Sequence, residues 1–183
     1  MTLLLGTDEA AHLLDEMADA VVARGGPAPL IVGVRRGGVP VAEALVARLA
    51  ERLGQPPDVG TLDITLYRDD ASTALPSLRI GPTEIPGSLD GRRVILVDDV
   101  LFTGRTVRAS LDELFDHGRP GSVELAVLID RGGRELPIQA DYVGRRVNLA
   151  SELRVDVLQG KNGLSAIAQP GTTPTSPPPP MNP

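Results

Sequence analysis

The feature that most constrains the fold is a stretch of thirteen residues, VILVDDVLFTGRT, at positions 94–106. Apolar residues typical of a buried strand lead directly into the adjacent carboxylates Asp98 and Asp99 and then into a short polar loop. Residues 104–118 have helical periodicity, so the loop joins a strand to a helix. This order predicts one unit of an open parallel α/β sheet, in which ligands bind at the carboxyl ends of the strands.

The rest of the chain alternates strands and helices in the same way. Strands are expected at 29–34, 59–70, 93–97 and 123–129, helices at 7–24, 39–54 and 104–118, and two short final strands within 141–160. Thr7 is the expected cap of the first helix. The predicted fold class is therefore α/β, with a mostly parallel central sheet flanked by helices.

Composition sets the limits of this fold. The chain has 183 residues, 42% of them apolar, which is enough for one domain with a sizeable core at residues 1–168. Residues 169–183 carry no charge and are rich in proline, which predicts a disordered tail. No cysteine is present, so disulfides and a thiolate nucleophile are excluded.

Charge and hydropathy bear on location and partners. The net charge of −6 argues against non-specific nucleic-acid binding through the field of the whole molecule. No apolar run approaches the roughly 20 residues of a membrane span. The first residues turn acidic without a basic start, unlike a secretory signal. A cytoplasmic protein without membrane contact is expected.

The polar loop after the acid pair has the chemistry of an anion site. Free N–H groups at the start of the predicted helix attract negative charge. Thr103 and Thr106 add hydroxyl groups, Arg105 adds a cation, and Gly104 lets a ligand approach the backbone. The sequence therefore predicts a phosphate-binding loop.

The two carboxylates would repel a phosphate unless they face something else. Hydroxyl groups, a metal ion or a developing cation would each suit them, and a ribose 5-phosphate can offer all three. The alternative is structural: Asp98 and Asp99 end the strand and Thr103 caps the helix. The glycine patterns of a Walker loop and of a dinucleotide fingerprint are absent from this stretch.

The stretch resembles the 5-phosphoribosyl-1-pyrophosphate (PRPP) motif of the type I phosphoribosyltransferases. Together with LDITLYRDD at 62–70 and DRGGRELPIQADYVG at 130–144, it resembles the PyrR family of pyrimidine-operon regulators that are also uracil phosphoribosyltransferases. The resemblance extends from about residue 8 to 158 and omits the tail. It implies a small hood over the base, which includes 130–137, and a mobile flap that begins at 65–70.

The resemblance implies a reaction in which uracil and PRPP give UMP and pyrophosphate with Mg²⁺, and it implies a homo-oligomer, a dimer or larger. The implied catalytic residues are Asp98, Asp99 and Arg68, and the two aspartates also hold Mg²⁺, directly or through water. The implied 5-phosphate site is Thr103, Gly104, Arg105 and Thr106, and the implied pyrophosphate site is Arg35, Arg36, Gly37, Gly38 and Tyr67. The implied base-binding residues are Asp130 and Arg131.

One motif departs from the family pattern. PyrR sequences usually have Thr-Arg-Gly in the pyrophosphate loop, whereas this chain has Arg36-Gly37-Gly38. Arg-Gly-Gly is similar to the loops of other phosphoribosyltransferases. The alternative function is therefore a phosphoribosyltransferase for another nucleobase, a purine, without RNA binding.

PyrR proteins also bind pyrimidine-operon mRNA when UMP is present. The implied RNA contacts are Arg134, Arg145 and Arg146. Asp15 and Asp19 stand where the family commonly has Thr and His, Gly133 replaces a His, and Gln139 replaces an Arg. Added carboxylates and lost donors weaken phosphate contacts. The sequence therefore predicts that RNA binding by the usual surface is weak or absent.

Overall fold

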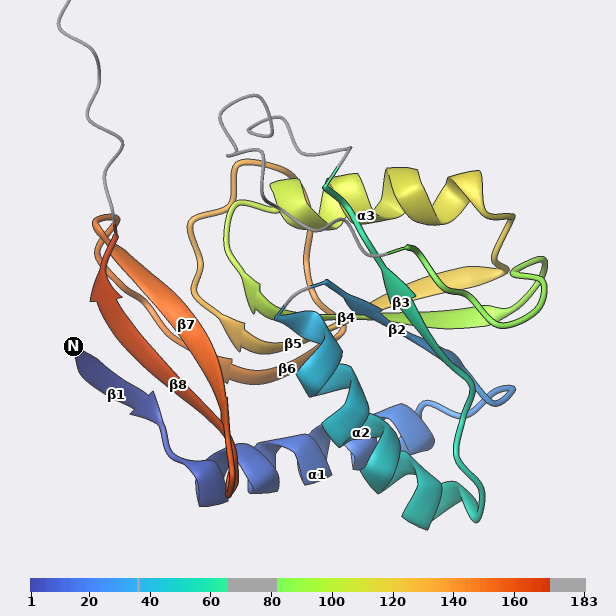
Figure 1. The fold of residues 1–183 in the computed structure, drawn as a ribbon, viewed down its shortest axis with the longest axis horizontal. Helices are drawn as coiled ribbons and strands as arrows, with labels where there is room; N and C mark the ends of the chain where they lie inside the picture. The colour runs from blue at the N-terminus through green and yellow to red at the C-terminus, as the bar shows by residue number, and fades with distance from the viewer. Residues whose placement is uncertain (36, 66–81, 172–183) are drawn as a thin grey trace, which may run out of the picture.

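The computed structural model describes residues 1–35, 37–65 and 82–171, and its elements are labelled in Figure 1. In chain order they are β1 (Thr2–Leu5), α1 (Thr7–Ala23), β2 (Leu30–Val34), α2 (Gly38–Leu53), β3 (Val59–Leu62), β4 (Arg93–Leu101), α3 (Arg105–Asp116), β5 (Ser122–Asp130), β6 (Tyr142–Arg146), β7 (Leu153–Gly160) and β8 (Gly163–Pro170). No helix in these described ranges is long and apolar enough to cross a membrane.

Five strands form a central sheet in the order β3-β2-β4-β5-β6, and every neighbouring pair is parallel. The predicted α/β class is therefore confirmed. A second, antiparallel sheet has the order β1-β8-β7 and combines the two ends of the described chain. Neither β1 nor β8 was expected from the sequence.

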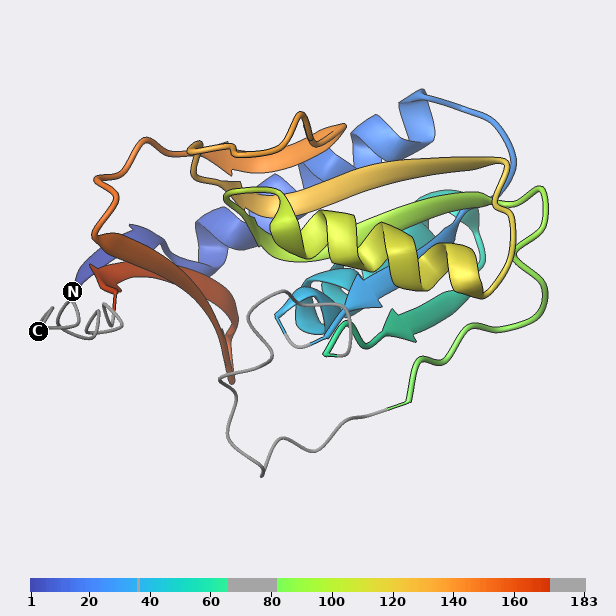
Figure 2. The same cartoon turned by 90° about the horizontal axis from the view of Figure 1, so that it is seen from above.

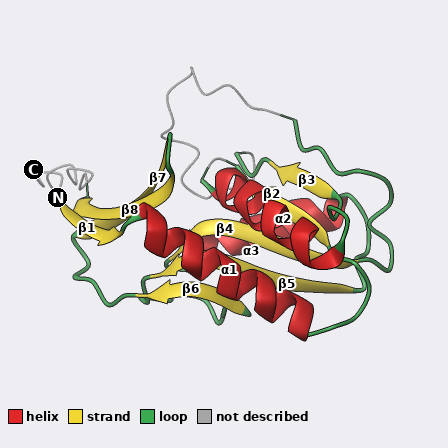
Figure 3. Ribbon diagram, turned by 90° about the horizontal axis from the view of Figure 1, so that it is seen from below, coloured by secondary structure: helices red, strands yellow, loops and turns green. Residues whose placement is uncertain are grey.

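Helices cover both faces of the central sheet (Figure 1). Ile95 and Val97 of β4 pack in the core beneath α1 and α2, whereas Val94 and Leu96 pack in the core beneath α3. On the first face, α1 lies along β5 and β6 while α2 lies along β2 and β4 (Figure 3). Burial on both faces explains why the central strands are almost continuously apolar in sequence.

The carboxyl ends of the central strands point toward the small β1-β8-β7 sheet (Figures 1 and 2). At this end β4 continues beyond its neighbour. Its pairing with β2 ends at Val97, while its pairing with β5 continues to Leu101. The acid pair Asp98-Asp99 therefore lies on the part of β4 that β2 leaves uncovered.

Several predicted boundaries are wrong. The strand expected to end at Val97 continues to Leu101, since β5 still pairs with it and the carboxylates of Asp98 and Asp99 accept the next amides along the chain. The strand expected over 59–70 ends at Leu62, because Asp63 accepts the Thr65 amide and turns the chain. Residues 66–70 lie outside the described residues.

Two predictions about the chain ends also need correction. Gly6, not Thr7, is the cap residue of α1, and no side-chain hydrogen bond closes that helix end. Residues 169–171, which were expected in the tail, belong to the fold, because β8 extends to Pro170 and the Gly171 amide donates to the Glu152 carbonyl. Residues 172–183 lie outside the described residues.

A buried ionic network joins β4, β5 and β6 near their amino ends. Arg93 donates two hydrogen bonds to the Glu124 carboxylate, both 2.9 Å long, and Tyr142 donates a third of 2.5 Å. Burial acts to raise the pKa of Glu124, but the hydrogen bonds from Arg93 and Tyr142 outweigh it and the pKa is lowered. The network therefore fixes three neighbouring strands at the end of the sheet opposite the acid pair.

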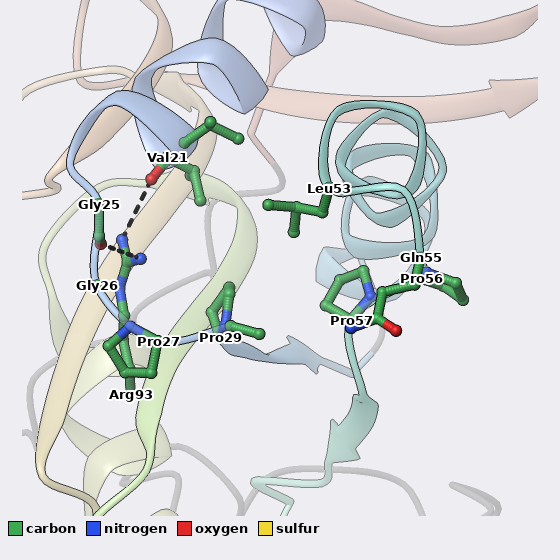
Figure 4. Close-up of a pocket in the computed structure, with 12 residues that line it drawn as sticks. Val21, Gly25, Gly26, Pro27, Pro29, Leu53, Gln55, Pro56, Pro57 and Arg93 are labelled. Carbon is green, nitrogen blue, oxygen red and sulfur yellow. Dashed lines mark hydrogen bonds between the residues drawn. The ribbon is translucent and has the colours of Figure 1, made fainter.

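A small pocket of about 150 Å³ lies at this same end, between the segments that enter β2 and β3 (Figure 4). Pro27, Pro29 and Pro57 line it, and the Arg93 guanidinium reaches its edge while donating to the carbonyls of Val21 and Gly25. Because the pocket is at the amino ends of the strands, it is separate from the site that the sequence predicts.

We expect Glu124→Gln to lower the free energy of unfolding by about 3 kcal/mol, because it leaves a buried guanidinium without its counter-ion. The lowered pKa of Glu124 means that this stabilisation is present above the unfolded-state pKa and is lost as the pH falls through the folded-state pKa. Urea titration of both proteins at pH 7 and at pH 3 measures the difference.

The control is Asp112→Asn, which removes a half-exposed ion pair with Arg108 on α3 and should change stability by less than about 0.5 kcal/mol. Equal stability losses in the two variants, or a Glu124→Gln loss that stays unchanged at pH 3, would contradict the role given to the network.

Candidate active site

The turn between β2 and α2 lies directly on the end of β4. A side chain at Gly38 would overlap the Val97 carbonyl, and a side chain at Gly37 would overlap the Asp99 carboxylate. Only glycine allows this close approach. The structure therefore brings the predicted pyrophosphate loop and the acid pair together, although they are about sixty residues apart in the chain.

The two carboxylates differ in environment. Asp98 is only 5% exposed and accepts a 2.9 Å hydrogen bond from the Asp99 amide. Asp99 is partly exposed, faces Gly37, and accepts a 2.9 Å hydrogen bond from the Val100 amide. Asp99 is therefore the carboxylate of the pair that is more accessible to a ligand.

The polar loop after β4 has the geometry of an anion site. Gly104 has a φ of +93°, in the left-handed region that favours glycine, and α3 begins at the next residue. The Thr103 hydroxyl accepts a 3.3 Å hydrogen bond from the Arg105 amide. The next N–H groups in the first turn of this twelve-residue helix have no acceptor within the helix, and the predicted anion site rests on them.

The cation of this loop already has an acidic neighbour. The Arg105 guanidinium donates to Glu135 at 2.8 Å, and both side chains are about half exposed. A phosphate bound at the loop would compete with Glu135 for this guanidinium. No local sequence pattern signals this pair, because the two residues are thirty positions apart.

The remaining predicted pyrophosphate contacts are only partly placed. Arg35 follows β2 and donates to the Thr61 hydroxyl of β3 at 2.9 Å. Its guanidinium is therefore held against β3, at the same end of the sheet as the glycine turn. Arg36, Tyr67 and Arg68, with residues 66–81 of the predicted flap, lie outside the described residues.

Asp130 and Arg131 lie at the end of β5, near the end of β4. Asp130 accepts hydrogen bonds from the Gly132 amide and from the Arg134 guanidinium. Arg131 is 6% exposed, and its guanidinium carbon lies 3.8 Å from the centroid of the Phe102 ring. Burial lowers the pKa of Arg131. The Arg131–Phe102 stack was missed, and no local pattern signals it.

The segment predicted to belong to the hood, 130–137, includes the end of β5 and part of the connection between β5 and β6, whereas the small sheet consists of β1, β8 and β7. The segment lies against the predicted phosphate-binding loop, because the amides of Glu135 and Leu136 donate to the Thr103 carbonyl. Strand β4 contacts β7, so that sheet still borders the site.

Two of the three predicted RNA contacts are engaged within the chain. Arg134 donates to several main-chain carbonyls and to Asp130. Arg145 donates to the Leu4 carbonyl and pairs with Glu9, which ties β6 to the start of the chain. Arg146 is 69% exposed, and its guanidinium is 4.0 Å from Asp130.

The two acids on α1 are also paired. Asp19 accepts a 2.5 Å hydrogen bond from Arg52, and Asp15 lies 3.3 Å from both Arg48 and Arg52 of α2. Asp15 and Asp19 are four positions apart, and so are Arg48 and Arg52, so each pair lies on one side of its helix. This spacing was the available sequence signal for an ionic contact between the two helices.

The carboxylates of Asp98 and Asp99 suit a Mg²⁺ ion that is bound partly by the substrate. Mg²⁺ is usually held by one or two carboxylates together with substrate phosphates and water. Asp98 and Asp99 supply such a pair beside the two loops. Among the described residues, no cluster of three or more His, Cys, Asp and Glu side chains is arranged to hold a metal ion.

Solved structures of known proteins share this fold. The chain is similar to hypoxanthine-guanine phosphoribosyltransferase from Bacillus anthracis, with a TM-score of 0.69 and 16% identity over 91% of this chain and 98% of that one. A hypoxanthine phosphoribosyltransferase from Staphylococcus aureus has a TM-score of 0.63 at 22% identity and covers 84% of this chain and 80% of its own. Both likenesses concern the fold.

Sequence comparison is more specific. The family model of the phosphoribosyl transferase domain matches residues 5–155. The bifunctional protein PyrR of Geobacter sulfurreducens is 50% identical over 86% of this chain and 90% of its own. The bifunctional protein PyrR of Chloroflexus aurantiacus is 49% identical over 90% of this chain and 92% of its own. The chain therefore belongs to the PyrR family of phosphoribosyl transferases.

Proposed function

We propose that the protein transfers a 5-phosphoribosyl group from PRPP to uracil, which forms UMP and releases pyrophosphate. The observation that carries this proposal is the contact of the Gly37-Gly38 turn with the acid pair of β4, beside the open start of α3. An anion site, a pair of acids and a second backbone loop thus meet at one end of the sheet. PRPP needs these three parts, one for each of its phosphate groups and one for its ribose.

The 5-phosphate binds at Thr103–Thr106. The N–H groups at the start of α3 and the threonine hydroxyls donate to it, and Arg105 exchanges Glu135 for the phosphate. The ribose 2- and 3-hydroxyls donate to Asp98 and Asp99, since ionised carboxylates only accept hydrogen bonds. The hydroxyls thereby fix the ring, and the carboxylates place negative charge near C1.

The pyrophosphate group binds at the glycine turn. Backbone N–H groups at Gly37 and Gly38, with Arg35 and Arg36, contact it, and Asp98 and Asp99 hold Mg²⁺ directly or through water. When bound, Mg²⁺ neutralises the charge that develops on the leaving group. The bond from C1 to the pyrophosphate oxygen breaks while uracil N1 bonds to C1, and the N1 proton passes to the departing pyrophosphate or to solvent. The nearby carboxylates stabilise the positive charge on the ribose ring in between.

The base lies toward the end of β5, near Asp130 and Arg131. Asp130 is already an acceptor for Arg134 and Gly132, so the base is read by main-chain groups of this segment more than by that carboxylate. Roles for Tyr67 and Arg68, the flap, a homo-oligomer and a cytoplasmic location stay predictions of the sequence.

Regulation through RNA is the second candidate, because the related proteins are bifunctional. The described surface favours weak RNA binding. Arg134 and Arg145 are engaged within the chain, and the arginines nearest to Asp15 and Asp19 are paired with them. Arg146 is the exposed member of the predicted RNA contacts. UMP-dependent binding to pyrimidine-operon mRNA is therefore proposed to be weak at the usual surface.

A filter-binding titration with a pyrimidine-leader RNA in the presence of UMP tests this second proposal. We expect no salt-sensitive binding below about 1 μM, because few guanidinium groups are free to neutralise phosphates. Submicromolar binding that weakens steeply with added salt would show that another surface reads the RNA.

Steady-state product formation from PRPP, Mg²⁺ and each nucleobase tests the enzymatic proposal. We expect UMP from uracil, and no comparable formation of IMP, GMP or XMP from the purine bases. Faster turnover with a purine would favour the alternative that the Arg-Gly-Gly turn permits. No product with any base would overturn the proposed activity.

The same assay tests the glycine contact. Gly38→Ala should lower kcat/KM for PRPP by about a hundredfold, since its new methyl group displaces the turn from the Val97 carbonyl. Gly6→Ala is the matched control, because no atom lies within 4 Å of its added methyl group, and its activity should stay within about twofold of the parent. Equal activities of the two variants would contradict the proposed pyrophosphate site.

A further inference from the structure

The phosphate-binding loop is supported from behind by the connection between β5 and β6. The Arg131 amide donates to the Leu101 carbonyl at 3.0 Å. The amides of Glu135 and Leu136 donate to the Thr103 carbonyl at 2.9 and 3.1 Å. Residues 131–138, named here the supporting loop, thus hold the main chain at both sides of Phe102.

Arg134 binds the carbonyl of Phe102, which lies between the bonded carbonyls of Leu101 and Thr103. Its Nη1 atom donates to the Phe102 carbonyl at 2.8 Å. Its Nε atom donates to the Ile138 carbonyl at 3.0 Å, and Nη2 donates to Asp130 at 2.6 Å. One guanidinium therefore closes the supporting loop on itself and fastens it to the phosphate-binding loop.

These bonds determine where the loop amides point. In a planar trans peptide the N–H points away from the C=O. Because the carbonyls of Phe102 and Thr103 face the supporting loop, the amides of Thr103 and Gly104 face the opposite side. These amides directly precede the free N–H groups of α3, so they extend the same anion site.

The close approach of the two loops needs Gly133. It has a φ of +71°, and a Cβ atom there would lie 2.5 Å from the Phe102 ring. Arg131 covers a face of the same ring at 3.8 Å. The Phe102 ring thus contacts Arg131 and leaves room only for glycine at position 133, and the Arg134 guanidinium reaches the Phe102 carbonyl.

We propose that Arg134 is a positioning residue for the phosphate-binding loop. This inference rests on the proposed phosphoribosyltransferase function and assigns Arg134 a role other than the RNA contact implied by the sequence. Its charge is matched by Asp130 and its donors are directed to carbonyls, with the side chain 23% exposed. It therefore orients the amides that bind phosphate and does not itself contact the phosphate.

Lysine cannot take over this role. The guanidinium reaches Ile138, Phe102 and Asp130 at once through the planar arrangement of its donors. An ammonium group is a point charge at the end of a flexible chain and lacks that fixed geometry. Charge retention alone should therefore not preserve the function of the loop.

The experiment compares Arg134→Gln and Arg134→Lys with the parent chain by NMR titration with UMP and with uridine. We expect both variants to lose about tenfold in UMP affinity, because misdirected amides no longer donate to the phosphate. Uridine lacks the phosphate, so its affinity should stay within about twofold of the parent. Arg146→Gln is the matched control, since Arg146 is also near Asp130 but does not reach the phosphate-binding loop.

The outcomes separate this inference from its alternatives. Parent-like UMP binding by both Arg134 variants overturns it, and so does an equal loss of affinity for UMP and uridine, which indicates general damage to the fold. If the glutamine variant does not fold, the lysine variant decides alone. A parent chain that binds uridine but not UMP, or neither, overturns the proposed function and with it this inference.

Discussion

The site depends on the unequal lengths of two neighbouring strands. Strand β2 ends at Val34, whereas β4 continues to Leu101 and keeps its pairing with β5. The turn that follows β2 is therefore free to cross onto the end of β4, and Gly37 and Gly38 let it come into contact with the acid pair. In the proposed binding mode, this difference in strand length lets a phosphate at the start of α3 and a leaving group at the glycine turn belong to one ribose.

The two ends of the central sheet differ in structure: a buried ionic network lies at one end and the candidate site at the other. At the amino ends, Arg93, Glu124 and Tyr142 form a buried network whose hydrogen bonds join three strands. At the carboxyl ends, polar groups surround the candidate site, and loops hold some of them in position. Arg134, like Arg93, pairs with a carboxylate and donates to main-chain carbonyls, and its proposed role is to orient the loop that follows β4.

The sequence predicted the parallel sheet and its helices because continuous apolar runs and 3.6-residue periodicity are local signals. The phosphate-binding loop could be predicted for the same reason: strand, loop and helix are contiguous in residues 94–106. The length of β4 was misjudged because two aspartates argue against a strand when neighbours are unknown. Strands β1 and β8 pair across almost the whole chain, and no local pattern shows such a pairing.

The same limit applies to the candidate site. The resemblance implied that Arg134 contacts RNA, whereas the structure shows that its guanidinium donates within the chain to the Phe102 and Ile138 carbonyls and to Asp130. Asp15 and Asp19 looked like bare acids until α2 placed Arg48 and Arg52 beside them. The chemistry of each side chain could be predicted from the sequence, but its ion-pair partner could be identified only from the fold.

The central claim is that one nucleotide binds where β4 leads into α3. Its most direct test is a crystal structure of the full chain with UMP and Mg²⁺. The account predicts the phosphate on the amides of residues 103–106 and the ribose hydroxyls on Asp98 and Asp99. A nucleotide bound instead in the pocket beside Arg93, or a phosphate held by the small β1-β8-β7 sheet, would contradict it.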